Sequence, residues 1–328
     1  MDVGTFCAQS HVLVVAGKGG VGKTTMSATL ARMASQRGLS VLIVELEGKS
    51  GITGAFGMAE DLGYEEIELQ AADPGLGQSS IRARRITPDD ALVEYLIDHG
   101  LKRVSKRLVS SGVVDVVSTA IPGIRDVLVL GKVKQLERDQ VADLIVVDAP
   151  ATGHAITFLT SASGLVNAAR GGPLRNQAQD VVELLSDPAR CRVILVTLPE
   201  DMPVSETIES AFTLEDKAGV QLGPVIVNAC DTAPVGLDKS TEAVVASAGI
   251  NVKPEHLDAL EAARLFRLER HAISKDQLER MARDLPLPQL LVPQMTAVAI
   301  GPAETQQLAD ALADAIAQLE PEPEGASV

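Results

Sequence analysis

Short runs of aliphatic residues alternate along the chain with longer segments in which apolar positions recur at helical spacing. Each run is nearly continuous in Val, Ile and Leu, a pattern typical of parallel strands that are covered on both faces. The alternation predicts an α/β fold with a doubly wound, mostly parallel sheet. The predicted strands are Val12–Ala16, Val41–Leu46, a more polar one near Ser79–Arg85, Leu144–Asp148, Arg192–Leu198 and Pro224–Asn228.

Helical periodicity fills much of the chain between these strands. The first helix is expected over Lys23–Gly38, where the final glycine suits a helix C-terminus. Thr87 and Pro88 have the residue types of an N-cap and a first helical position, and they predict a helix whose apolar residues continue to Leu108. Further helices are expected at Gln177–Leu185, as one or two helices within Glu255–Asp284, and at Ala303–Leu319.

The 328 residues contain no internal repeat. One α/β domain is therefore expected over residues 1–320, with a small helical insert formed roughly by residues 87–135 and 160–190. The last residues, 321–328, are polar and rich in proline and glutamate, which predicts a disordered tail.

Composition and charge exclude several classes of function. Acidic residues outnumber basic ones by 44 to 29, for a formal net charge of −15, whereas nucleic-acid-binding proteins usually present a basic face. Aromatic residues make up 2% of the chain and Trp is absent, which leaves few platforms on which bases could stack. The chain is therefore expected to bind no nucleic acid.

The N-terminus and the cysteines predict a cytoplasmic location. The N-terminus lacks the basic segment and apolar core of a secretory signal, and no apolar run is long enough to span a bilayer. Cys7, Cys191 and Cys230 are far apart, so they form neither a disulfide framework nor a C-x-x-C zinc pair. We therefore expect a reduced, cytoplasmic protein with no zinc clamp.

The strongest motif lies between the first strand and the first helix. Residues 17–25 read GKGGVGKTT, which fits G-x-x-x-x-G-K-[ST] in the strand–loop–helix context of a phosphate-binding loop. Its glycines let backbone N–H groups surround phosphate oxygens, and the helix N-terminus adds partial positive charge. In such a loop Lys23 neutralises the β- and γ-phosphates of ATP, and the Thr24 hydroxyl binds Mg²⁺. The expected nucleotide-binding residues are Gly17, Lys18, Gly19, Gly20, Val21, Gly22, Lys23, Thr24 and Thr25.

A second candidate element follows the strand Leu144–Asp148. Asp148 stands at the carboxyl end of this predicted strand, where ligands bind in open α/β sheets. A carboxylate there can hold a Mg²⁺-bound water, and Gly153 allows the turn that follows. An aspartate that only caps the loop fits the same position.

These motifs together resemble the arsenite-pump ATPase family, which includes the ATPases that target tail-anchored proteins. DAPATGH at residues 148–154 is similar to the family's second switch, DTAPTGH, and VLIVELEGKSGITGAFG at 41–57 is similar to its strand and first switch. PGIRD at 122–126 resembles PGIDE, and GPVIVN ends in Asn228, where the family has an asparagine that reads adenine. The resemblance covers most of the chain from Val12 to Asn228 and is greatest for actinobacterial members.

The resemblance implies a nucleotide-dependent dimer. Lys18 marks the deviant P-loop class, in which this lysine crosses a dimer interface and contacts the partner's nucleotide. Glu47 matches the first-switch aspartate that positions the attacking water. The implied catalytic residues are Lys18, Lys23 and Glu47. The alternatives are a solvated loop lysine for Lys18, a strand-end acid for Glu47 and a turn residue for Asn228.

Several positions depart from the family pattern. Glu47 is one methylene longer than the family's aspartate. We therefore expect it to orient the attacking water still, but with a lower rate of hydrolysis. Ser50 and Gly51 replace His and Asn, which changes the hydrogen bonding around the γ-phosphate. Asp126 replaces a glutamate, and a functional role and a simple helix N-terminal acid fit it equally. His154 matches the second switch, but a lone loop histidine fits as well.

The kinds of cargo handled by the family leave sequence marks that this chain lacks. Metalloid binding needs clustered cysteines, and none are clustered here. Targeting factors use a methionine-rich helical groove, whereas none of the seven Met residues falls between Ile81 and Arg190. The acidic C-terminus also differs from the basic membrane-binding helix of related positioning ATPases.

Our first hypothesis is therefore a dimeric switch that binds and hydrolyses ATP with Mg²⁺ and acts on a protein client or partner. The dimer is either a homodimer or a heterodimer with a paralogue. A nucleotide-binding regulator or assembly scaffold with weak or no hydrolysis is the main alternative, because of Glu47, Ser50 and Gly51. A metalloid-pump subunit ranks last.

Overall fold

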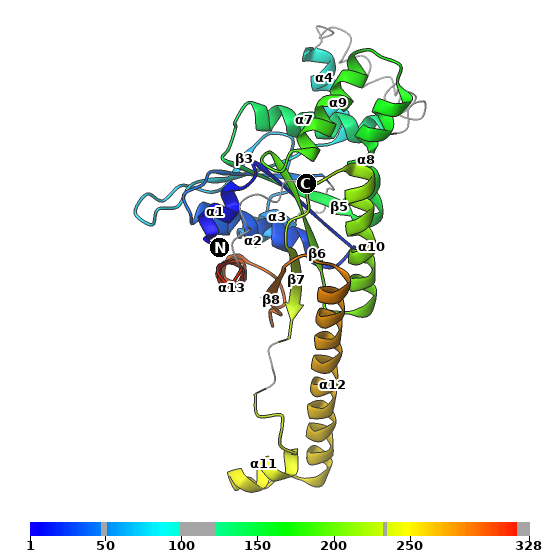
Figure 1. Ribbon diagram of the computed structural model, residues 1–328. Helices are drawn as coiled ribbons and strands as arrows, with labels where there is room; N and C mark the ends of the chain where they lie inside the picture. Colours follow the sequence, from blue (N-terminus) through cyan, green and yellow to red (C-terminus); the bar gives the residue numbers. More distant parts are fainter. Residues whose placement is uncertain (47–50, 99–122, 232–234, 320–328) are drawn as a thin grey trace.

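A mostly parallel sheet forms the centre of the molecule. The computed structural model describes residues 1–46, 51–98, 123–231 and 235–319, and in this part of the chain the strands follow the order β3-β4-β2-β5-β1-β6-β7-β8 (Figure 1). Neighbouring strands are parallel except for β3 and β4. The strands are β1 (Val12–Gly17), β2 (Val41–Glu45), β3 (Ile67–Gln70), β4 (Ile81–Arg85), β5 (Leu144–Ala151), β6 (Cys191–Thr197), β7 (Val225–Cys230) and β8 (Gln289–Pro293).

Helices cover both faces of the sheet, because alternate residues of the central strands pack in opposite directions. Val41 and Ile43 belong to one apolar cluster, and Leu42 and Val44 belong to a second. Helices α1 (Val3–Ala8), α2 (Lys23–Ser35), α3 (Gly51–Ala55) and α13 (Pro302–Ala317) contribute to the first cluster. Helices α4 (Pro88–Asp98), α7 (Ile124–Arg138), α8 (Thr152–Ala168), α9 (Pro173–Ser186) and α10 (Asp201–Ala218) contribute to the second. The predicted doubly wound α/β fold is confirmed.

The predicted strands are all present, with small shifts of their ends. The buried strand at Leu144 continues to Ala151, so Asp148 lies inside β5 and not at its last residue. The first helix ends at Ser35, and Gly38 takes the expected left-handed conformation with φ of 83° just beyond it. The sequence pattern missed α1, α3, the helix Thr241–Ala248 and the strands β3 and β8.

A group of helices lies at one end of the sheet, where Figure 1 shows α4, α7 and α9 at the top of the view. Helix α4 begins as predicted, with the N–H group of Asp90 donating to Thr87 Oγ1 at 3.2 Å and Pro88 at the first helical position. The predicted continuation of this helix through Leu101, Val104 and Leu108 lies outside the described residues, as does the tail at 321–328. The single-domain organisation with a helical insert stays a prediction.

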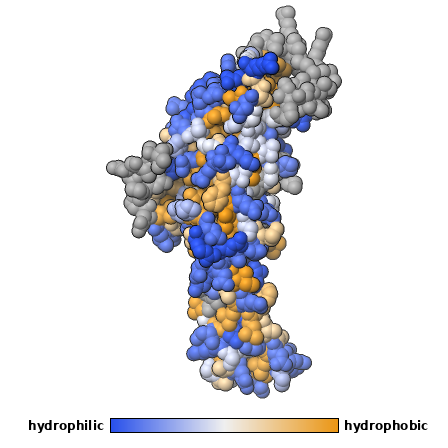
Figure 2. Space-filling view, turned by 45° about the vertical axis from the view of Figure 1, so that its right-hand side comes forward, coloured by the Kyte–Doolittle hydropathy of each residue, from blue (hydrophilic) through white to orange (hydrophobic). Residues whose placement is uncertain are grey.

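Helices α11 (Thr241–Ala248) and α12 (Pro254–Asp284) form an arm that projects from the rest of the molecule (Figure 1). The segment for which the sequence allowed one or two helices is thus one helix, α12, and only Met281 within it is buried. Leu260, Leu265 and Phe266 are 50%, 52% and 59% exposed. Figure 2 shows apolar side chains interspersed with polar ones over this arm.

Candidate nucleotide-binding site

The phosphate loop connects the carboxyl end of β1 to the N-terminus of α2, on a central strand of the sheet. Gly20 and Gly22 have φ angles of 88° and 94°, a left-handed conformation that disfavours residues with a Cβ atom. Gly22 is the N-cap of α2, and no side chain accepts a hydrogen bond from the first turn of the helix there. The first N–H groups of α2 are therefore available to an anion.

Gly17 brings the loop against the neighbouring strand. A Cβ atom at this position would lie 2.3 Å from the carbonyl oxygen of Val196, which is its register partner on β6. This distance is far below a van der Waals contact, so only glycine fits without a shift of the backbone. The close approach holds the start of the phosphate loop on the sheet.

The two lysines of the loop have different partners. Lys23 Nζ donates to the carbonyl oxygen of Lys18 at 3.4 Å, so the Lys23 side chain folds back over the loop. Lys18 Nζ forms an ion pair at 2.5 Å with Glu206 Oε1 on α10, and both side chains are 35% exposed. The Lys23 ammonium thus stays within the phosphate loop, whereas the Lys18 ammonium is paired with a helix outside the loop.

Thr24 and Asp148 meet at the loop although they are far apart in the sequence. Thr24 Oγ1 donates to Asp148 Oδ2 at 2.7 Å, and Ser27 Oγ donates to Asp148 Oδ1 at 3.2 Å. The Asp148 residue is 7% exposed. A hydroxyl group beside a buried carboxylate supplies the oxygen ligands that Mg²⁺ prefers, and Mg²⁺ completes its shell with waters and phosphate oxygens. These donors fit a Mg²⁺ ion that is bound together with a nucleotide.

Other metal sites can be assessed only in the part of the chain that the structure describes. There, no three or more His, Cys, Asp or Glu side chains gather into a cluster that could hold a metal ion. Ser27, whose hydroxyl orients Asp148, was not singled out from the sequence. Its position one turn after Thr24 on the same helix was a signal that could have identified it.

Asn228 contacts the phosphate loop from the end of β7. Its Nδ2 atom donates to the carbonyl oxygen of Val21 at 2.9 Å, and its Oδ1 atom accepts from the N–H group of Ala229 at 2.8 Å. Ala229 has a φ angle of 54°, a conformation that is strained for a residue with a Cβ atom. The structure therefore brings Asn228 to the loop, and its contact with adenine stays a prediction.

The described part of the first switch packs against Thr24. Gly51 begins α3, and a Cβ atom there would lie 3.0 Å from Thr24 Cγ2, so the start of α3 packs against the candidate metal ligand. Glu47 and Ser50, which precede it in the first switch, lie outside the described residues. The predicted role of Glu47 in positioning water stays a prediction.

Asp126 and His154 lie in the first turns of α7 and α8. Burial raises the pKa of Asp126, and the charge of His154 acts in the opposite direction. The structure thus brings these two sequence candidates within electrostatic range of each other.

Glu45 is a buried acid that the sequence analysis did not single out. It ends β2 with 0% of its surface exposed, and Arg85 Nε donates to its Oε2 atom at 3.0 Å. Burial raises the pKa of Glu45, the hydrogen bond and charge of Arg85 lower it, and the charges of Asp148 and Asp61 raise it further. An acid that ends an otherwise aliphatic strand was the sequence signal for it.

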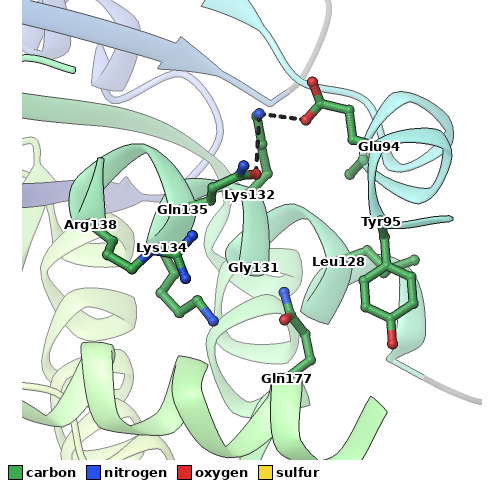
Figure 3. A pocket seen from close by; sticks show the side chains of 10 residues that line it. Glu94, Tyr95, Leu128, Gly131, Lys132, Lys134, Gln135, Arg138 and Gln177 are labelled. Atoms are coloured by element: carbon green, nitrogen blue, oxygen red, sulfur yellow. Dashed lines mark hydrogen bonds and ion pairs between the residues drawn. The ribbon is translucent and has the colours of Figure 1, made fainter. Parts of the chain in front are cut away.

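A separate pocket lies among the helices α4, α7 and α9 (Figure 3). It has a volume of about 190 Å³, below the range of roughly 300–1,000 Å³ that is usual for small-molecule sites. Lys132 at its wall is paired with Glu94 at 2.5 Å, and Lys134 is paired with Asp180 at 2.6 Å. No lining residue comes from the phosphate loop, so this pocket is not part of the candidate nucleotide site.

Comparison with known proteins agrees with this geometry. Residues 10–169 match the family model of the anion-transporting ATPases, a range that contains the phosphate loop and Asp148. This part of the chain belongs to the anion-transporting ATPase family. The resemblance inferred from the switch motifs is thereby confirmed.

Relatives of this chain are found in bacteria, archaea and fungi. The chain is 39% identical over 224 residues to the ATPase BagA of Mycobacterium tuberculosis, which covers 66% of this chain and 64% of that protein. It is 26% identical over 239 residues to a putative arsenical pump-driving ATPase of Halobacterium salinarum, covering 67% of this chain and 35% of that protein. It is 31% identical over 173 residues to the ATPase get3 of Schizosaccharomyces japonicus, covering half of each chain.

The match to the mycobacterial relative therefore spans slightly less than two thirds of that protein's length. Among the helices that the structure describes, none combines the length and the hydrophobicity needed to cross a bilayer.

Proposed function

We propose that the chain is a cytoplasmic, Mg²⁺-dependent ATPase that works as a dimeric switch and couples its nucleotide state to a protein client. The observation that carries this proposal is the 2.7 Å hydrogen bond between Thr24 Oγ1 and Asp148 Oδ2 beside the phosphate loop. It joins the last part of the loop motif to the buried acid of the second switch. The family match over residues 10–169 and the relatives named as ATPases support the same activity.

The loop residues would bind ATP and stabilise negative charge on its phosphates. The N–H groups at the start of α2 and the Lys23 ammonium would hold the β- and γ-phosphates. Thr24 would bind Mg²⁺ directly and Asp148 would hold a water of its shell. When bound, Mg²⁺ neutralises charge on the phosphate oxygens. Glu47 would orient the attacking water, and Lys18 would stabilise the γ-phosphate of the partner subunit in the transition state.

The proposed dimer rests on Lys18. In the chain itself this lysine is paired with Glu206 and not folded over its own loop as Lys23 is, which supports a role outside its own site. The second subunit is either another copy of this chain or a paralogue. Binding of ATP at both sites would then close the two subunits, and hydrolysis would release them, so that the nucleotide state sets the geometry seen by the client.

A nucleotide-binding regulator with weak hydrolysis is the second candidate. Gly51 favours it, because a glycine packed against Thr24 cannot supply the hydrogen bond that an asparagine would make near the γ-phosphate. A metalloid-pump subunit has less support. Burial raises the pKa of Cys7 and Cys191 to about 12 and that of Cys230 to about 11, so these cysteines stay thiols at neutral pH and not the thiolates that bind soft metals.

The test measures phosphate release with Mg²⁺ and ATP together with the mass of the protein by light scattering. The wild-type chain is compared with Lys23→Ala, Lys18→Ala and Glu47→Ala. We expect Lys23→Ala to abolish turnover and binding, and Lys18→Ala and Glu47→Ala to abolish turnover while ATP still binds. If the wild-type chain binds ATP without turnover even when a paralogue is added, the regulator replaces the ATPase as the conclusion.

A further inference from the structure

Three charged side chains form a row across the strands β4, β2 and β5. Glu45 is the register partner of Arg85 on one side and of Asp148 on the other. Register partners on parallel strands point to the same face of a sheet. Ile43 and Val146, two residues before Glu45 and Asp148, pack in the same apolar cluster as Met26 and Leu30 of α2.

Glu45 and Asp148 therefore both face the layer of α2, the helix that carries Thr24. Two carboxylates thus stand side by side below the phosphate loop. The Thr24 contact shows that at least one of them reaches the candidate metal ligand.

One carboxylate oxygen of Glu45 accepts no hydrogen bond from the other charged side chains of this row. Arg85 Nε donates to Oε2, but Oε1 is buried and accepts no hydrogen bond from the described residues. A buried acceptor without a donor destabilises a folded protein, so native proteins rarely keep one unless a water, an ion or a ligand completes it. The free oxygen is thus an observation that points to a missing partner.

The neighbouring Asp148 has less capacity to accept further hydrogen bonds than Glu45 Oε1 has. Its Oδ2 atom accepts from Thr24 and its Oδ1 atom accepts from Ser27, so both oxygens already have donors. A Mg²⁺ ion keeps several waters, and each of these waters donates hydrogen bonds to acceptors around it. Glu45 Oε1 offers these waters an acceptor in addition to the oxygens of Asp148.

We propose that Glu45 is a positioning residue of the Mg²⁺ site, whose Oε1 atom accepts a hydrogen bond from a water in the shell of the ion held by Thr24 and Asp148. The inference rests on the proposed function and adds to it a residue from a third strand. Arg85 then has the task of fixing the Glu45 side chain through Oε2, which leaves Oε1 for the water. Under the opposing view, Glu45 and Arg85 only tie β2 to β4.

The experiment measures how much Mg²⁺ tightens nucleotide binding, and it uses no turnover. A non-hydrolysable ATP analogue is titrated into the full chain by calorimetry, once in EDTA and once in excess Mg²⁺, and the ratio of the two dissociation constants is compared between variants. Glu45→Gln keeps the size of the side chain and an oxygen for Arg85, but it replaces the second acceptor by an NH₂ group. Arg85→Gln is the matched control, because it removes the ion pair and leaves the carboxylate.

We expect Glu45→Gln to reduce the Mg²⁺ effect by about tenfold or more, with binding in EDTA unchanged, since loss of an outer-shell partner typically weakens a metal site 10- to 100-fold. Arg85→Gln should lose less of the Mg²⁺ effect than Glu45→Gln, because it removes the donor that fixes the carboxylate but leaves the acceptor itself. An equal Mg²⁺ effect in Glu45→Gln and the wild-type chain, or an equal loss in both variants, overturns the inference.

Two further results separate this inference from the proposed function. If Glu45→Gln does not fold, judged by circular dichroism, Glu45→Asp takes its place: the shorter carboxylate should reduce the Mg²⁺ effect, and an unchanged effect overturns the inference. A wild-type chain that binds the analogue neither in EDTA nor in Mg²⁺ refutes the proposed function itself. Normal Mg²⁺-dependent binding in the wild type together with an unaltered Glu45→Gln variant refutes only the role of Glu45.

Discussion

The ammonium group of Lys18 lies 2.5 Å from the carboxylate of Glu206 in the same chain. Glu206 belongs to α10, which follows β6, so the ion pair connects the phosphate loop to a helix on the opposite face of the sheet from α2. A lysine that is proposed to act on the partner's nucleotide is therefore held within its own subunit in this conformation. In the proposed dimer, Glu206 would compete with the partner's nucleotide for the same ammonium group.

Removal of the Glu206 charge should favour the closed dimer. We expect Glu206→Gln to lower the protein concentration at which ATP drives dimer formation by roughly two- to fivefold, because a partly exposed ion pair contributes at most about 1 kcal/mol. Sedimentation velocity with a non-hydrolysable ATP analogue measures this concentration. Glu209→Gln, an exposed acid one turn later on α10, is the control and should not change it. Weaker dimerisation of Glu206→Gln contradicts the competition.

The carboxylate of Asp148 should be needed for turnover more than for nucleotide binding. Asp148→Asn keeps the size of the side chain and an acceptor for Thr24 but removes the charge proposed to hold a Mg²⁺-bound water, so we expect phosphate release to fall about 10- to 100-fold. Ser27→Ala, which removes only the donor to Oδ1, should reduce turnover less than tenfold. Turnover of Asp148→Asn at the wild-type rate would exclude Asp148 from the metal site.

The central strands were predictable because burial on both faces demands uninterrupted aliphatic runs. The run at Val12, for example, becomes β1, which pairs with a strand on each side and is buried along its whole length. The edge strands were missed for the opposite reason. β3 reads IELQ with one buried residue, and β8 reads QLLVP with two, so neither has the uninterrupted burial of a central strand.

The candidate site also has a part that could be predicted from the sequence and a part that could not. The phosphate loop is local in sequence, so its residues could be named before the fold was known. The partners of those residues come from distant strands and helices: Glu206 reaches Lys18 across 188 positions, and Asp148 reaches Thr24 across 124. Asp148 was found because it belongs to a motif, whereas Glu45 and Glu206 became candidates only once strand register and helix packing placed them beside the loop.

The glycines of the loop should differ in their effect on stability. Gly17→Ala places a Cβ atom 2.3 Å from the backbone oxygen of Val196, so we expect it to lower the free energy of unfolding by about 1–3 kcal/mol or more. Gly20→Ala meets no atom within 4 Å and suffers only the strain of its φ angle of 88°, roughly 1 kcal/mol.

Urea unfolding of these variants measures the difference, with Gly54→Ala as the control. Gly54 lies in α3 with open space around it, so its replacement should leave stability unchanged or raise it by less than about 1 kcal/mol. A Gly17→Ala variant as stable as Gly20→Ala would show that β1 and β6 can separate at this point without loss, contrary to the close packing of the loop on the sheet.

Stability should depend on pH through Asp126. Because burial raises the pKa of Asp126 against the opposing charge of His154, the native state holds this proton more tightly than the unfolded state does. The contribution of Asp126 to stability is thus present below its unfolded pKa of about 3.8 and is lost as the pH rises through the higher folded value.

Asp126→Asn should therefore raise the free energy of unfolding at neutral pH by roughly 0.5 kcal/mol, a small gain because the group is partly exposed. Urea unfolding at several pH values should show this gain shrinking as the pH falls toward 3.8. A gain that grows on acidification would mean that Asp126 is stabilised as a carboxylate, by His154 and the N-terminus of α7, and would reverse the sign assigned to its burial.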